Sequence, residues 1–120
     1  MPDGVIVLAH ELATANRLIA IGYNVEFRTP SNVEGVKNPD ILLNGEIWEM
    51  KSPEGSGKHN ISDQMKRAGK QSRRMVLDLA RSPLDELAVI SEVRHRLKGN
   101  KRLDQVLIIR RDGTALELSR

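Results

Sequence analysis

An Asn-Gly dipeptide at residues 44–45 constrains the fold of this chain more than any other feature of its sequence. It separates two short runs, residues 40–43 and 46–51, in which apolar side chains are frequent. Both positions of a two-residue hairpin turn need positive φ angles, which Asn-Gly adopts readily. The sequence therefore predicts a β-hairpin whose register is fixed by its short turn. The predicted pairs are Leu43 with Glu46, Leu42 with Ile47, Ile41 with Trp48, and Asp40 with Glu49.

This register places two carboxylates opposite each other. Side chains alternate between the two faces of a strand, so Asp40, Glu49 and Lys51 share one face of the hairpin. The Cβ atoms of opposed residues lie roughly 5 Å apart, and like charges at that distance destabilise a sheet. A divalent cation would remove the repulsion, so we predict a metal site on this face. Trp48 and Met50 project from the other face and are predicted to lie in the core.

Length and composition exclude several classes of protein. A chain of 120 residues forms one domain, residues 1–120, with a core of its own. It has no cysteine, which excludes a disulfide framework and a thiolate metal site. No apolar run approaches the roughly 20 residues of a membrane helix. Three aromatic residues are too few for a base-stacking platform, whereas a formal net charge of +3 is compatible with a phosphate-rich partner.

The first predicted element is an amphipathic helix. Its apolar stripe comprises Leu8, Leu12, Ala15 and Ile19, and Gly22 is predicted to end it. A strand at 24–28 and the hairpin follow. The later elements are a loop at 52–60, a helix beginning near Ser62 as its N-cap, a helix from Pro83 to about Leu97, and strands at 106–109 and 114–118. Residues 75–79 fit either a strand or the end of a helix. This order predicts an α/β domain with a mixed β-sheet flanked by helices.

The charged face of the hairpin carries oxygen ligands suited to magnesium. Mg²⁺ takes one or two carboxylates together with water and substrate phosphate, and Asp40 and Glu49 provide such a pair. The carbonyl of Met50 is a further candidate ligand. Lys51 points to the same face, where its ammonium group would orient an attacking water or stabilise charge on a phosphorus centre.

Glu11 is a candidate fourth member of this site. It lies at the flank of the predicted apolar stripe of the first helix, from which a carboxylate can reach a metal on the sheet. A glutamate in the first turn also stabilises the helix dipole. Both interpretations stay open at this point.

The pattern Pro-Asp, eight residues, then Glu-x-Lys resembles the motif of the PD-(D/E)xK phosphodiesterase superfamily. The resemblance covers residues 8 to 80 and implies an αβββαβ core, followed here by a C-terminal helix and β-hairpin. It implies that Asp40, Glu49 and Glu11 bind Mg²⁺, Mn²⁺ or another divalent cation and that Lys51 assists catalysis. The alternative is a solvated strand face on which Glu49 and Lys51 form a surface pair worth about half a kcal/mol.

Basic residues follow the hairpin and are candidates for binding nucleic acid. The second helix is predicted to carry Lys66, Arg67, Lys70 and Arg73 opposite an apolar stripe of Ile61, Met65 and Ala68. Related nucleases often place a glutamine where Gln64 stands. Lys58 and His59 lie in the preceding loop, where a substrate could be clamped. An ordinary solvated helix face is the alternative.

The run from Asn38 to Gly55 also resembles the C-terminal toxin domains of CdiA-type contact-dependent growth inhibition proteins. That resemblance implies a tRNA nuclease that acts in the cytoplasm of a target bacterium. It also implies a cognate immunity protein and an origin as the C-terminal fragment of an exported protein. Two other functions stay open: a DNA endonuclease of resolvase or restriction type, and a non-catalytic nucleic-acid-binding domain. Nothing in the residues themselves separates RNA from DNA as substrate.

Overall fold

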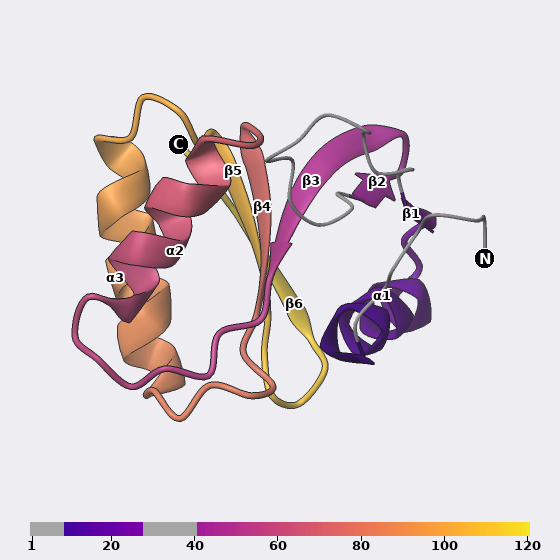
Figure 1. Cartoon of the computed structure of the whole chain (residues 1–120), viewed down its shortest axis with the longest axis horizontal. Helices are drawn as coiled ribbons and strands as arrows, with labels where there is room; N and C mark the ends of the chain where they lie inside the picture. The colour runs from indigo at the N-terminus through magenta and orange to yellow at the C-terminus, as the bar shows by residue number, and fades with distance from the viewer. Residues whose placement is uncertain (1–8, 28–40) are drawn as a thin grey trace, which may run out of the picture.

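The computed structural model describes residues 9–27 and 41–120, which form one six-stranded sheet between two layers of helices (Figure 1). The predicted order of elements is confirmed. The elements are α1 (Ala9–Ile21), β1 (Val25–Phe27), β2 (Ile41–Leu43), β3 (Glu46–Lys51), α2 (Asn60–Gly69), β4 (Arg74–Asp78), α3 (Glu86–Lys98), β5 (Gln105–Ile109) and β6 (Ala115–Ser119). No helix within these ranges has the length and apolar character needed to cross a bilayer.

The strands lie side by side in the order in which they occur in the sequence. Neighbours from β1 to β3 are antiparallel, β3 to β5 are parallel, and β6 returns antiparallel to β5. The two parallel connections are made by α2 and α3. Because such crossovers are right-handed and the sheet grows in one direction, both helices cover the same face. This leaves α1 on the opposite face (Figure 1).

The hairpin has the predicted turn and register. Asn44 and Gly45 have φ angles of 50° and 86°, and Leu43 pairs with Glu46, Leu42 with Ile47 and Ile41 with Trp48. Asn44 is held further by Asn24, whose backbone N–H donates to Asn44 Oδ1 at 2.9 Å. Asp40, predicted to face Glu49, lies outside the described residues.

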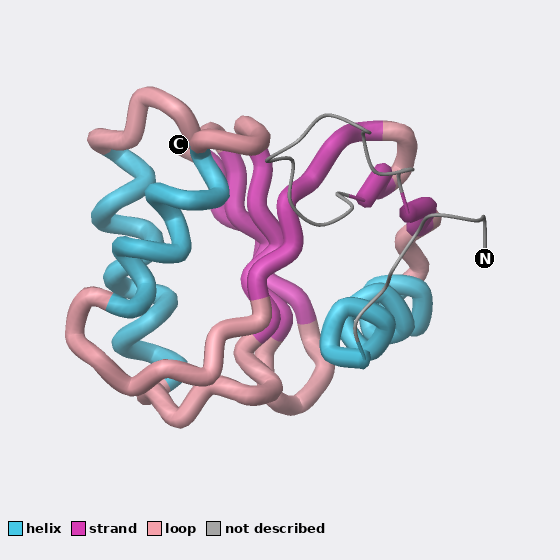
Figure 2. The backbone as a smooth tube through the Cα atoms, viewed as in Figure 1, coloured by secondary structure: helices cyan, strands magenta, loops and turns pink. Residues whose placement is uncertain are grey.

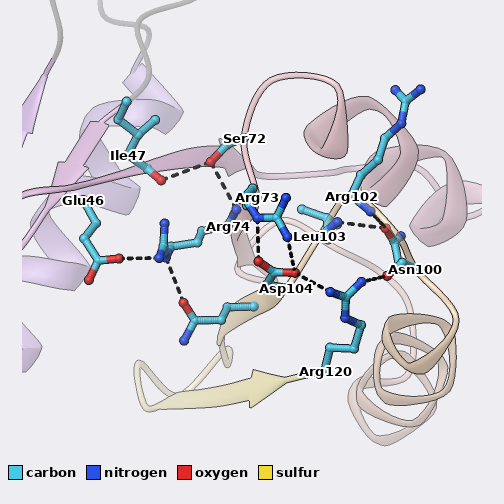
Figure 3. Close-up of polar contacts among 11 residues, drawn as sticks. Glu46, Ile47, Ser72, Arg73, Arg74, Asn100, Arg102, Leu103, Asp104 and Arg120 are labelled. Carbon is cyan, nitrogen blue, oxygen red and sulfur yellow. Dashed lines mark hydrogen bonds and ion pairs between the residues drawn. The ribbon is translucent and has the colours of Figure 1, made fainter.

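Polar contacts fix the start of β3 to the central strands (Figure 3). The hydroxyl of Ser72 donates to the carbonyl of Ile47 at 3.0 Å and accepts from the N–H of Arg74 at 3.1 Å. The guanidinium of Arg74 contacts Glu46 at 2.7 Å and Gln105 at 2.8 Å. These contacts tie β3, β4 and β5 together and so fix the position of the strand that carries Glu49 and Lys51.

Each face of the sheet has its own core. The face under α2 and α3 buries a large apolar cluster, to which α2 contributes Ile61, Met65 and Ala68 as predicted. The face under α1 buries Trp48, Val76, Leu107 and strand residues near them, with Leu18 of α1 packed against them. Residues 75–79, left open by the sequence, form most of β4 and the residue after it, and all five are buried.

The predicted apolar stripe of α1 is wrong at Leu12 and Ile19, although Ala15 is buried as predicted. Leu12 and Ile19 are 46% and 54% exposed, and Leu8 lies outside the described residues. The buried residues of α1 are Glu11, Thr14, Ala15 and Leu18. A contact with the sheet sets this rotation, because Thr14 donates a hydrogen bond of 2.7 Å to the buried Asp78 of β4.

Two predicted helix starts also differ from the structure. α2 begins at Asn60 with His59 at its N-cap, so Ser62 is not the cap, and its hydroxyl donates instead to the carbonyl of His59. α3 begins at Glu86, three residues after Pro83. Its N-cap is Asp85, whose carboxylate accepts from the N–H of Ala88 at 2.9 Å and so satisfies a free helix donor.

Candidate active site

Glu49 and Lys51 form a buried ion pair near the end of β3. Lys51 Nζ lies 3.5 Å from Glu49 Oε1, and the two side chains are only 21% and 8% exposed. Met50 between them packs into the core on the other face, as the alternation of the strand predicts. A solvated surface pair would be far more exposed, so that alternative does not describe these residues. Moving a charged side chain out of water costs free energy, so buried charges are usually paired. Buried charged groups beside a cleft are candidates for a functional site.

A polar pocket of about 180 Å³ opens beside this pair. Its walls come from α1, β3 and α2, which contribute Glu11, Lys51 and Gln64 respectively. Three residues predicted for the site from distant parts of the sequence therefore meet in one place. The pocket lies at the C-terminal end of β3, where both helical layers approach the sheet.

Glu11 belongs to the packed face of α1 and not to its flank. It is 6% exposed and lies in the first turn of the helix. Its position in the pocket brings it together with Lys51 and Gln64. The same position in the first turn still allows it to stabilise the helix dipole, so the two interpretations are compatible.

The segment that follows Lys51 is held by Arg81. The Nε of Arg81 donates to the Ser52 hydroxyl at 3.1 Å, and its other guanidinium nitrogens contact the Ser52 carbonyl and Glu54. Ser52 and Pro53 line the pocket. Figure 2 shows this connection leaving β3 and running to α2 along one end of the sheet. Arg81, which follows the end of β4, therefore holds the segment of residues 52–54, part of which forms one side of the pocket.

Asp78 supports the site, and the sequence prediction missed it. It is fully buried, and its Oδ2 lies 2.7 Å from both Thr14 Oγ1 and Arg17 Nη1 of α1. Its Oδ1 accepts from the N–H of Ala80 at 3.0 Å. These bonds attach α1 to β4 one turn from Glu11. An acidic residue inside an apolar run is the signal that reveals such a position, because a buried carboxylate needs partners.

The donor set suits a hard divalent cation. Glu11 and Met50 line the pocket, and Glu49 lies beside it in the pair with Lys51, so carboxylate oxygens, which such a cation prefers, are close to the pocket. Across residues 9–27 and 41–120, no three His, Asp or Glu side chains converge closely enough to hold a metal. The remaining predicted ligand, Asp40, lies outside those ranges.

The predicted basic face of the second helix is not continuous. α2 ends at Gly69, Lys70 is its C-cap, and Arg73 lies beyond the helix in a bidentate pair with Asp104 at 2.6 and 3.0 Å. Lys66 and Lys70 line a separate groove between α2 and α3, while Gln64 lines the pocket.

The other predicted binding residues are exposed and dispersed. Arg67 lies on the open surface of α2, and His59 is the N-cap of that helix. Lys58 lines a small hollow together with Asp85 and Glu92. Two carboxylates in this hollow make it unfavourable for a phosphate, so a substrate clamp at Lys58 has no support from the geometry.

The family of the chain is decided by its match to the family described as the contact-dependent growth inhibition CdiA C-terminal domain, which spans residues 37–115. The chain belongs to this family. It is thus a CdiA C-terminal toxin domain, as the resemblance in the sequence implied. No curated protein matches the sequence of this toxin domain.

A solved structure supports the same assignment. The toxin domain is similar to a chain of the CdiA-CT/CdiI toxin and immunity complex from Burkholderia pseudomallei, with a TM-score of 0.72 and 25% sequence identity. The similarity covers 92% of this chain and 83% of that chain. The whole α/β architecture is therefore shared.

Proposed function

We propose that this CdiA C-terminal toxin domain is a metal-dependent endonuclease of the PD-(D/E)xK type that cleaves tRNA in the cytosol of a target bacterium. The observation that carries the proposal is the buried Glu49–Lys51 pair beside a pocket that also contains Glu11. The resemblance of the Pro39–Lys51 segment to the PD-(D/E)xK motif supports it. The order of elements through β4, αβββαβ, is the one that this superfamily implies.

The residues take distinct roles in this proposal. Glu49, Glu11 and Asp40 would hold Mg²⁺ or Mn²⁺, with the Met50 carbonyl as a further ligand. The bound metal would lower the pKa of a water molecule and polarise the phosphoryl group. Lys51 stabilises the negative charge that develops on the phosphoryl oxygens, because its ammonium is fixed by Glu49. Gln64 orients the substrate or the attacking water by hydrogen bonding from the opposite wall.

An immunity protein is the second partner that we propose. The similar structure from Burkholderia pseudomallei is a complex of toxin and immunity protein, and this chain shares its fold. A cell that makes such a nuclease needs a protein that blocks it. We propose that the toxin domain is exported as the C-terminal part of a CdiA protein and that its producer is protected by a cognate immunity protein.

The proposal is tested by incubating the protein with total tRNA and with plasmid DNA, each with Mg²⁺ or with a chelator. We expect Mg²⁺-dependent cleavage of tRNA only. Glu49→Gln keeps the size of the side chain and removes its charge, so we expect a folded protein whose cleavage rate falls at least about a hundredfold.

Glu46→Gln is the matched control, because Glu46 lies on the same strand in a half-exposed pair with Arg74. Its cleavage rate should stay near that of the wild type. Full activity of Glu49→Gln would refute the site. Cleavage of plasmid would indicate a DNA endonuclease, and binding without cleavage of either substrate would indicate a non-catalytic domain.

A further inference from the structure

A second concave surface lies between α2 and α3, and its charge is one-sided. This groove has a volume of about 560 Å³. Its cations are Lys66 of α2, Lys70 at the C-cap of that helix, Arg96 of α3, and Arg102 of the loop that follows α3. No Asp or Glu is among the described residues that line it. We refer to it as the basic groove.

Helix dipoles do not account for this much charge. Basic residues often stabilise the C-terminal ends of helices, and α2 and α3 both end beside the groove. Two helix ends together carry only about one negative charge. Glu92 balances Arg96 in an ion pair of 2.7 Å. The two helix ends therefore offset about one of the four positive charges and Glu92 offsets another, so about two positive charges have no compensating negative charge.

Arg102 is held in the groove by its loop. The Oδ1 of Asn100 accepts from the backbone N–H groups of both Arg102 and Leu103 at 2.8 Å. Gly69 of α2 lets the loop approach, because a Cβ added there would lie 3.1 Å from the Cβ of Arg102. Figure 3 shows the guanidinium of Arg102 extending away from the polar network below it. No hydrogen bond or ion pair joins this guanidinium to another described residue, so it is available to a ligand.

The basic groove and the candidate active site lie on opposite flanks of α2. Gln64 lines the pocket, and Lys66, two residues later, is rotated by about 200° around the helix. α2 also carries the chain back from the end of β3 to the start of β4. The C-terminal residues of α2 therefore lie near the N-terminal ends of these parallel strands, whereas Lys51 lies at the C-terminal end of β3.

We infer that the basic groove binds the phosphate backbone of the nucleic-acid substrate away from the bond that is cut. This inference rests on the proposed nuclease function and specifies its substrate as a structured nucleic acid long enough to reach both sites. The longest dimension of the protein is 40 Å. At about 3.4 Å per step, a B-form duplex of about a dozen base pairs spans it, and an A-form RNA duplex, which rises less per step, needs a few more base pairs. A short oligonucleotide would reach the pocket without contacting the groove.

The test measures binding of a fluorescent RNA hairpin of about 16 base pairs, in chelator and over a range of salt concentrations. The parent protein is Glu49→Gln, which prevents cleavage. We expect the added pair Lys70→Glu and Arg102→Glu to weaken binding at least about tenfold. The slope of log affinity against log salt should become shallower by about two, because two phosphate contacts are lost. Lys66→Gln with Lys70→Gln is a milder variant that should change both quantities in the same direction.

The matched control is Arg94→Glu with Lys98→Glu. These residues are exposed on the flank of α3 that faces away from the groove, and the change in net charge is the same. We expect the control to bind nearly as the parent does. Equal weakening in both pairs, an unchanged salt slope in the groove variants, or no binding by the parent would overturn the inference.

The binding test of the basic groove does not depend on whether Glu49 is catalytic. If Glu49→Gln still cleaves RNA when Mg²⁺ is present, the proposed active site fails, while binding in chelator still reports on the groove. If the active site is correct and the groove is not, tRNA cleavage by the Lys70→Glu and Arg102→Glu variant would keep its wild-type KM. A duplex of DNA of equal length in the same assay shows whether the groove discriminates between the two backbones.

Discussion

The two helical layers of this toxin domain are attached to the sheet in different ways. α2 and α3 bury only apolar residues against it, among them Ile61, Met65, Val93 and Leu97. α1 buries one large apolar side chain, Leu18, together with Glu11 and Thr14. The first attachment is a hydrophobic core, and the second depends on polar contacts.

Candidate site residues lie on both sides of this contrast. A purely apolar face on α1 would pack more firmly against the sheet, but it would remove the Glu11 carboxylate from the pocket that Lys51 lines. Glu11, which lines the pocket, and the bonds from Thr14 and Arg17 to Asp78 therefore lie within the same few turns of α1.

The α2–α3 layer also reaches the site, because Gln64 lines the pocket. Glu49 and Lys51 pair in register with Met75 and Leu77 of the apolar cluster. Three measurements examine the contrast between the two attachments.

The largest loss of stability is expected in the apolar layer. Leu77 of β4 is fully buried under α2 and α3, and Leu77→Ala leaves a cavity there. We expect a loss of about 2–5 kcal/mol in the free energy of unfolding, measured by urea denaturation. Leu12→Ala is the control, since Leu12 of α1 is 46% exposed and should lose far less. Equal losses would show that the two layers do not differ as described.

An intermediate loss is expected from the polar attachment of α1. Asp78→Asn keeps an acceptor for Thr14 but removes the charge that pairs with Arg17. We expect the free energy of unfolding to fall by about 1–3 kcal/mol, the usual value of a hydrogen bond to a charged group. Arg17→Gln removes the partner whose side chain is 37% exposed and should cost less. An unchanged stability of Asp78→Asn would mean that α1 is held by Leu18 and its apolar neighbours alone.

The smallest effect is expected on the outer face of α1. Ile19 is 54% exposed, so Ile19→Gln should change the free energy of unfolding by no more than about 0.5 kcal/mol. Leu18→Gln, one residue away, buries an amide at a fully enclosed position and should be strongly destabilising. Thermal melts of the two variants compare the faces directly. A large loss of stability in Ile19→Gln would mean that Ile19 packs against the sheet, as the predicted apolar stripe requires.

Local signals in the sequence were sufficient for the order of elements and for the hairpin. The Asn44–Gly45 turn sets the register through backbone conformation alone, so the pairing of Ile41 with Trp48 followed from it. The rotation of α1 was not accessible in this way, because Asp78 lies 64 residues from Thr14 in the sequence. An apolar stripe predicts which face is buried only when no polar partner on the sheet competes with it.

The site was predicted in part for the same reason. Glu49, Lys51 and Met50 lie within one strand, and their placement follows from the alternation of side chains. The basic residues after the hairpin were assigned to one surface, but the end of α2 at Gly69 separates Arg73 from Lys66 and Lys70. The residue at which a helix ends decides which of the following side chains share its face. The sequence pattern did not predict that residue for α2.

The strand order described above also bears on how the chain reaches this structure. Every strand pairs only with the strands before and after it in the sequence. The entropy lost on closing a connection grows with its length, so contacts between neighbours in the sequence favour fast folding. We therefore expect the sheet to form from neighbouring strands, without the two ends of the chain having to meet.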